Sequence, residues 1–433
     1  MTPMAKDNVM TSDATLLQPN AAEPAPAAVA TEQGIAPNVS CADKVSLAAL
    51  VLLVLLGLNL RPFLTSVGPV LDLMRVDIGL DFRAAAMLTT LPFVLMGLIA
   101  FMGIGVARRL GERRALAGAL LLLMLGCGYR AVVQDGAQLI ASAGLAGAGV
   151  AMIQALMPGV AKRWFADRIA MAMGLYSAAL VGGGALGSLA STWLNAYGGW
   201  RLGLSIWALP AFVVFLLWWV CAPRTAPLAA DGPAPVSTRS FFRNRRAWQL
   251  AAYFGLTNSG YSSLVAWLPS FYQQQNMSLQ ASGNLLAWLA MFQATAAFAL
   301  PMLARRSIDR RAALWLTISL QAAGFTGFAL APNAAPWLWV AMAGFGLGGF
   351  FSLSLILSLD HLSGAQAAGT LAAFVQGVGF LLASSAPWLI GWLRDCGASF
   401  ITGWWLHVGV LGAMAVLTVK FAPASYRRSM QGL

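Results

Sequence analysis

Apolar residues fall into long uninterrupted runs, and polar residues gather in the short segments between them. Each run has about 20 residues, the length that an α-helix needs to cross a bilayer. The pattern therefore predicts an all-α membrane protein with twelve transmembrane helices, at about 46–71, 83–106, 115–133, 138–161, 168–194, 201–221, 247–271, 281–304, 313–331, 336–359, 367–391 and 400–421.

Two stretches without such runs divide the chain. Residues 1–45 are rich in Ala, Pro, Thr and Asp, which predicts a disordered cytoplasmic tail. Residues 223–246 carry four prolines and five arginines, as expected of a cytoplasmic linker. The predicted domains are six-helix bundles at 46–222 and 247–422, with a second cytoplasmic tail at 423–433.

Composition excludes several classes of protein. Of 433 residues, 59% are hydrophobic and 10% are charged, whereas about 25% are charged in a soluble domain. A soluble enzyme of this length cannot keep so much apolar surface from water. No nucleophile–base arrangement is visible, so we expect no enzyme. Four dispersed cysteines and two histidines predict neither a metal site nor a cofactor.

The net charge of +12 comes from residues in short loops, so it predicts no nucleic-acid partner. Instead it sets the orientation in the lipid bilayer. With the N-terminus inside, cytoplasmic segments hold 21 of the 27 Lys and Arg residues, outer segments hold five, and Arg61 lies within a span. Cytoplasmic loops of membrane proteins carry this excess of positive charge, so both termini are predicted to be cytoplasmic.

The two halves are repeats of each other. Residues 108–114 reappear at 305–311, at an offset of 197, and residues 174–194 match 369–389 at an offset of 195. Such parallel repeats of six spans are a transporter architecture.

The repeated basic loop resembles the signature of the major facilitator superfamily, although Arg108 and Arg305 stand where that signature has an acidic residue. We expect these loops to gate the transporter by pairing with carboxylates and helix ends. The alternative is an orientation anchor without a gating role. The candidate gating residues are Arg108, Arg109, Glu112, Arg113, Arg305, Arg306, Asp309 and Arg310.

Arg61 is the most informative residue, because it lies about 22 Å along the first span at 1.5 Å per residue. A cation at this depth is a functional candidate, and no Asp or Glu lies near the middle of any span. We expect Arg61 to bind an anionic substrate in a water-filled cavity, although it could instead extend toward the membrane surface.

Neutral polar residues in other spans complete the predicted substrate site: Thr65, Gln154, Asn258, Tyr261 and Gln376. They could equally bond neighbouring helices. Asp360 and His361 form the single acid–histidine pair, which indicates either a proton relay or an ordinary helix end.

Several segments resemble the cyanate transporter family of the major facilitator superfamily. They are Leu58 to Pro69, Gln154 to Pro158, Tyr253 to Tyr261, Ala266 to Pro269, Leu359 to His361 and Gln376 to Phe380. The resemblance implies a multi-pass protein of the bacterial inner membrane that carries cyanate or a similarly small compound. A related branch is associated with export of 2-nitroimidazole.

We therefore expect a secondary transporter of a small anion, with cyanate as the leading substrate, that works by rocking of two bundles and is a monomer. One alternative is export of a neutral heteroaromatic compound such as 2-nitroimidazole. Another is a membrane signalling or scaffold protein that transports nothing.

Overall fold

The computed structural model describes residues 39–165, 168–222, 238–304, 307, 309–362 and 365–430. The chain forms two compact units, Met1–Ala42 and Asp43–Leu433. Of the first unit only residues 39–42 are described, and they begin a helix. Everything below concerns the second unit. Residues 1–38 of the predicted tail and 223–237 of the predicted linker lie outside the described part.

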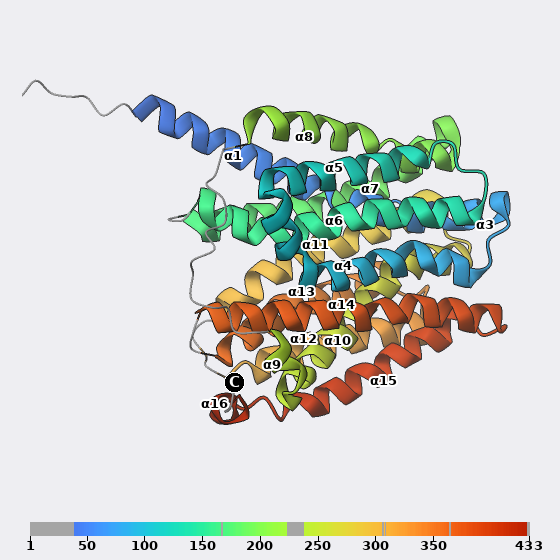
Figure 1. Ribbon diagram of the computed structural model, residues 1–433. Coiled ribbons are helices and arrows are strands. Elements are labelled where there is room, and N and C mark those ends of the chain that lie inside the picture. Colours follow the sequence, from blue (N-terminus) through green and yellow to red (C-terminus); the bar gives the residue numbers. More distant parts are fainter. Residues whose placement is uncertain are drawn as a thin grey trace, which may run out of the picture. The chain divides into compact units, whose positions relative to one another are not determined.

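The described chain is helical and contains no strand (Figure 1). Each of the twelve predicted spans overlaps a helix. The helices are α1 (Val39–Asn59), α2 (Pro62–Thr65), α3 (Val67–Ile78), α4 (Phe82–Leu110), α5 (Glu112–Tyr129), α6 (Gly136–Trp164), α7 (Ile169–Ser205), α8 (Ala208–Cys221), α9 (Thr238–Phe242), α10 (Arg245–Gln273), α11 (Leu279–Ala304), α12 (Arg311–Leu330), α13 (Pro336–Asp360), α14 (Ala365–Asp395), α15 (Phe400–Thr418) and α16 (Tyr426–Ser429).

Nine helical segments of the described chain are long and apolar enough to cross a membrane. The other predicted spans coincide with α5, which begins with three charged residues, α8, which has 14 residues, and α10, whose middle is polar. The membrane character of the chain is thus confirmed. That all twelve spans cross the bilayer, with both termini in the cytoplasm, stays a prediction.

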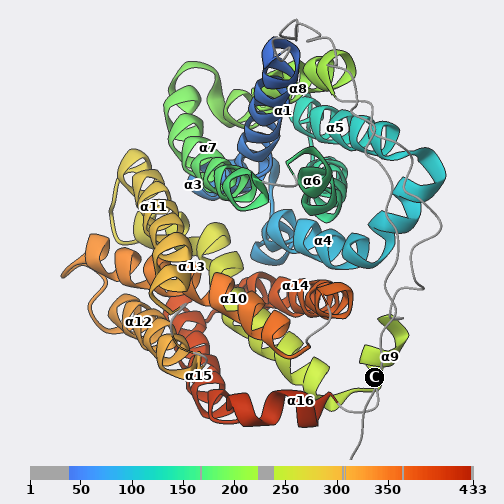
Figure 2. The ribbon, with the colours of Figure 1, turned by 90° about the vertical axis from the view of Figure 1, so that its left-hand side faces the viewer.

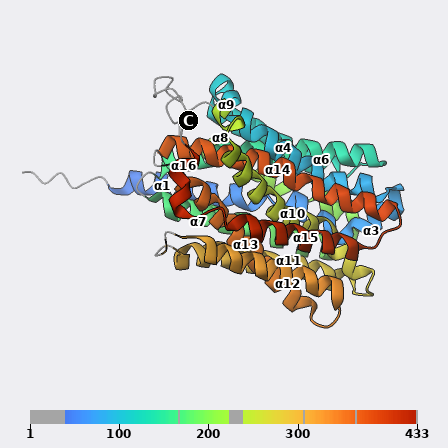
Figure 3. The same ribbon diagram turned by 90° about the horizontal axis from the view of Figure 1, so that it is seen from below.

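The helices form two groups that follow the order of the sequence. Figure 2 shows α1 to α8 on one side and α10 to α15 on the other. Between the groups, α4 packs along α14 and α7 packs along α11. The long helices of both groups lie alongside one another (Figure 3). These two helix pairs, distant in sequence, form most of the interface between the halves, and α2 and α3 also contact α10.

The first span is broken in the middle. Helix α1 ends at Asn59, and the four-residue α2 begins at Pro62. Proline has no N–H to donate, and its ring clashes with the carbonyl of the residue four positions earlier, here Leu58. Asn59 satisfies part of the exposed helix end by donating from Nδ2 to the carbonyl of Leu55, at 2.8 Å. The break leaves Arg61 between two helices.

Glycines of α7 pack against this break. A Cβ on Gly183 would overlap the carbonyl group of Leu58, and a Cβ on Gly187 would lie 2.7 Å from the Cα of Pro62. Small residues allow such close approach between membrane helices. The glycine-rich segment of α7 therefore fixes the position of the broken span, including Arg61.

The fifth and sixth predicted spans are not separated by a loop at 195–200 as the apolar pattern predicts. Helix α7 continues to Ser205 through a kink at Gly198 and Gly199, beyond the predicted end at 194. Gly199 has a φ of 69°, a left-handed conformation that glycine adopts without steric cost. The two glycines make a tight turn that the apolar pattern alone does not reveal.

Polar contacts join the halves at their predicted outer ends. The carboxylate of Asp395 accepts hydrogen bonds from the backbone N–H groups of Phe82 at 2.9 Å and Arg83 at 3.0 Å, and it pairs with the Arg83 side chain. Nearby, Gln273 donates to the carbonyl of Pro69 at 2.9 Å. Within the described chain, side-chain hydrogen bonds between the halves lie at this end or near the middle. These contacts hold the halves together at the end that is predicted to face outward.

We predict that Gly183→Ala lowers the stability of the folded protein by about 1–3 kcal/mol, because its methyl group must displace the Leu58 carbonyl. Thermal unfolding in detergent measures this as a lower midpoint. Gly174→Ala, on the same helix, is the control, because no heavy atom lies within 4 Å of that Cβ position. Equal midpoints for the two variants would contradict the described packing.

Candidate functional site

Arg61 reaches from the broken first span to the other half of the molecule. Its Nη1 donates a hydrogen bond to the hydroxyl of Tyr261 in α10, at 3.0 Å. Its guanidinium carbon also lies 4.9 Å from the centre of the Tyr261 ring, within the range of a cation–π contact. The side chain is half-buried. Arg61 therefore points into the interface between the halves and not toward lipid.

The charge of Arg61 is not neutralised by any carboxylate of the described chain. Tyr261 is a neutral partner, and Nη1 is the one guanidinium nitrogen with a hydrogen bond to a described residue. Nε is buried without a partner. Burying a cation is costly unless it is paired or solvated. The geometry therefore leaves donor capacity for an anion.

Thr65 and Asn258 are committed to the protein itself. The Thr65 hydroxyl donates to the carbonyl of Gly184 in α7 at 2.7 Å, which ties α2 to α7. The Asn258 amide donates to the carbonyl of Phe254, one turn earlier in α10, at 2.7 Å. Both side chains are buried. Their geometry fits helix packing, and their role as substrate ligands stays a prediction.

Gln154 in α6 and Gln376 in α14 are half-buried. Neither amide has a hydrogen-bond partner among the described residues, so both keep donors and acceptors for a solute. Within the described chain, no hydrogen bond joins either of them to Arg61. The structure therefore brings together Arg61 and Tyr261 from the predicted set, and the two glutamines remain candidates.

A row of aromatic side chains beside Tyr261 was not predicted. Phe93 of α4 lies 6.4 Å from the Tyr261 ring and 6.1 Å from that of Phe380 in α14. Phe380 in turn lies 5.7 Å from Phe254. Phenylalanine occurs in most of the predicted spans, so the sequence gives no signal that these rings meet.

Arg130 is the second unexpected feature. The sequence indicates an outer-segment cation, but the side chain is fully buried. Its Nη1 donates to the carbonyl of Phe63 in α2 at 2.8 Å, and its Nε to Ser142 at 3.3 Å. Arg130 therefore braces the short helix that follows Arg61. Its position near the end of a predicted span, next to Cys127, gives no hint of this contact.

This architecture matches a known family. The model of the Major Facilitator Superfamily matches residues 47–387. The chain belongs to the major facilitator superfamily.

Two curated relatives of this facilitator come from Escherichia coli (strain K12). The chain is 44% identical to "Cyanate transport protein CynX" over 378 residues, which cover 87% of this chain and 98% of the relative. It is 29% identical to "2-nitroimidazole transporter" over 351 residues, which cover 80% of this chain and 88% of the relative. The resemblance to the cyanate transporter family is thus confirmed.

Solved structures show the same fold. The facilitator superimposes on the nucleoside transporter NupG (D323A mutant) with a TM-score of 0.71 at 14% identity, over 87% of this chain and 99% of the other. It also superimposes on a bacterial homologue of the human lysosomal transporter Spinster, in an inward-facing and unoccupied conformation. That match has a TM-score of 0.66 at 17% identity and covers 90% of this chain and 98% of the other. At these identities the likeness concerns the fold alone.

Two ion pairs connect the basic loops to neighbouring helices of this facilitator. Glu112 pairs with Arg163 at the end of α6, and Arg310 pairs with Asp360 at the end of α13, at 3.1 Å. Asp360 follows Arg163 by 197 positions, the offset of the loops themselves. Each half therefore has one ion pair between its basic loop and this helix end, although Glu112 itself corresponds to Asp309 at that offset.

Other candidate gating residues have separate partners. Asp309 pairs with Arg311 at 2.6 Å, and Arg113 donates to the carbonyl of Trp219. Arg108 and Arg109 are exposed. The remaining two candidates, Arg305 and Arg306, lie outside the described residues. Every described ion pair and hydrogen bond of the candidate gating residues stays within one half, so a gating role remains a prediction.

Asp360 and His361 face different neighbours. Asp360 binds Arg310, while Nδ1 of the buried His361 donates to the carbonyl of Leu357 at 2.7 Å. The imidazole stacks on Tyr426 of α16, with ring centres 4.2 Å apart. Burial, together with the charge of Arg246, lowers the pKa of His361 from 6.5 to about 4, although the bond to Leu357 opposes the shift. A relay through this pair stays a prediction.

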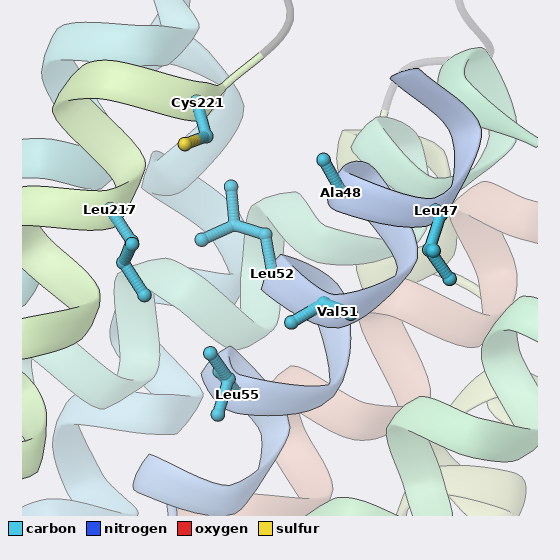
Figure 4. A pocket seen from close by; sticks show the side chains of 7 residues that line it. All are labelled: Leu47, Ala48, Val51, Leu52, Leu55, Leu217 and Cys221. Carbon is cyan, nitrogen blue, oxygen red and sulfur yellow. The ribbon is translucent and has the colours of Figure 1, made fainter. Parts of the chain in front are cut away.

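A pocket of about 320 Å³ lies away from these residues, between α1 and α8. Figure 4 shows its side chains, which are Leu47, Ala48, Val51, Leu52, Leu55, Leu217 and Cys221. All are apolar or a thiol, and several are exposed on the outside of the helices. The pocket has no group that could hold an anion, so we do not assign the substrate to it.

We predict that acid destabilises the C-terminal end through His361. The unfolded chain binds a proton near pH 6.5 and the folded chain only near pH 4, so stability is full above 6.5 and falls as the pH drops toward 4. Thermal unfolding midpoints at pH 7 and pH 5 test this. His361→Phe, which retains a ring against Tyr426, is expected to lose less stability than the wild type over that interval. An equal loss would show that His361 does not contribute.

Proposed function

We propose that this facilitator transports cyanate by alternating access. The observation that carries the proposal is the Arg61 guanidinium, which lies between the halves with a neutral hydroxyl as its one described hydrogen-bond partner. A cation in a membrane interior marks a substrate pathway. The 44% identity to an E. coli cyanate transport protein supports this choice of anion.

The small number of donors at the site also supports a small anion. Cyanate is linear and carries one negative charge, so one guanidinium and a few neutral donors are proportionate to it. Arg61 supplies the charge. Tyr261, Gln154 and Gln376 supply neutral groups from α10, α6 and α14.

Transport then requires the predicted outer end to open. The Asp395 contacts with α4 and the Gln273 contact with Pro69 must break, while the inner ends of the halves approach. Arg61 joins both halves through Tyr261, so an anion that competes for the guanidinium acts on the contact between them. We place the protein in the bacterial inner membrane, as a monomer.

A second candidate is export of a neutral heteroaromatic compound. The rings of Phe93, Tyr261 and Phe380 form a surface suited to stacking, and a relative with 29% identity is a 2-nitroimidazole transporter. Such a substrate does not need the charge of Arg61, which separates the two candidates.

We expect Arg61→Ala to reduce uptake of labelled cyanate into reconstituted vesicles to the level of empty vesicles, because no other cation replaces the guanidinium. Arg61→Lys should retain part of the uptake, since it keeps the charge but loses the planar donor fork. Arg428→Ala removes an exposed cation from α16 and is the control.

Undiminished cyanate uptake by Arg61→Ala would refute the anion site. The second candidate would be established if the wild type and Arg61→Gln transported 2-nitroimidazole equally and neither transported cyanate. Uptake indistinguishable from empty vesicles for both compounds in the wild type would indicate a protein that transports neither.

A further inference from the structure

Tyr176 of α7 has a buried hydroxyl without a partner. Its side chain is 6% exposed, and the hydroxyl oxygen makes no hydrogen bond within the described chain. The other buried tyrosines all bond: Tyr253 to Thr418, Tyr272 to Pro332 and Tyr426 to Phe421. Buried hydroxyls are rarely left unpaired in native proteins. Among the buried tyrosines of the described chain, Tyr176 is therefore the exception, and its hydroxyl is available to a bound acceptor.

Tyr176 lies on the contact between α7 and the first span. A Cβ on Gly57 would be 2.8 Å from the Tyr176 carbonyl oxygen and 3.3 Å from its ring. Gly57 is about one helical turn before Arg61. Further along the same contact, a Cβ on Gly184 would be 3.3 Å from the Cβ of Arg61. Tyr176 and Arg61 thus share one helix contact.

Both side chains also keep a buried donor without a partner. The Tyr176 hydroxyl and the Nε of Arg61 make no hydrogen bond within the described chain. Two unpaired donors on one helix contact, one of them cationic, favour an acceptor with negative charge. A buried donor that is left unpaired loses its hydrogen bonds to water without replacing them, which is unfavourable.

We propose that the Tyr176 hydroxyl is a second donor to the anion that Arg61 holds, and that it determines specificity. This inference rests on the proposed function and deepens it. Two donors from different helices suit a linear anion with acceptor atoms at both ends, such as cyanate or azide. A monatomic anion such as bromide gains less from the second donor.

Vesicle uptake and anion binding by purified protein test the proposal together. Tyr176→Phe is expected to raise the KM for cyanate at least about tenfold, the effect of losing one hydrogen bond to a charged ligand. In Tyr176→Phe, inhibition of cyanate uptake by azide should weaken more than inhibition by bromide. Tyr197→Phe, a 72% exposed tyrosine on the same helix, is the control and should match the wild type.

A thermal measurement separates ligand binding from a structural role. Tyr176→Phe removes no described hydrogen bond, so without anion it should unfold at or above the wild-type midpoint. A midpoint several degrees lower would overturn the role of Tyr176. The same conclusion would follow if the KM and the azide-to-bromide ratio of Tyr176→Phe equalled those of the wild type while Arg61→Ala abolished uptake. Either result would leave the proposed function standing. No uptake and no anion-dependent shift of the wild-type midpoint would overturn both.

Discussion

The close packing of α7 on the broken first span is the constraint on which the candidate site depends. Pro62 cannot donate to the carbonyl of Leu58, and glycine at 183 lets α7 approach that carbonyl. The approach fixes the backbone on both sides of Arg61, and Thr65 fastens it by donating to Gly184. A guanidinium on a continuous helix would follow that helix, whereas here its position is set by two helices together.

Much of the fold follows from the sequence because membrane helices are encoded locally. A run of apolar residues must satisfy its backbone hydrogen bonds internally, so it forms a helix wherever it lies. The depth of Arg61 and the absence of a carboxylate near it are local properties too. The turn at Gly198 and Gly199 is harder to predict, because helix and turn differ there in the conformation of two residues within a continuous apolar stretch.

The contacts of the site were less predictable, since sequence gives depth but not the neighbour across a helix interface. Thr65 and Asn258 were expected to face a solute, yet both donate to backbone carbonyls. Arg130 was expected near the membrane surface and is buried against Phe63. Tyr176 resembles any tyrosine in a span until its hydroxyl is found without a partner.

Arg61 and Tyr261 are separated by 200 positions, an interval like those that relate the two halves of the chain. The two residues therefore stand at corresponding distances along the two halves, and they meet with different chemistry. If both positions held arginine, two like charges would repel in surroundings where water screens them poorly. The neutral tyrosine at 261 makes the meeting compatible with a single bound charge.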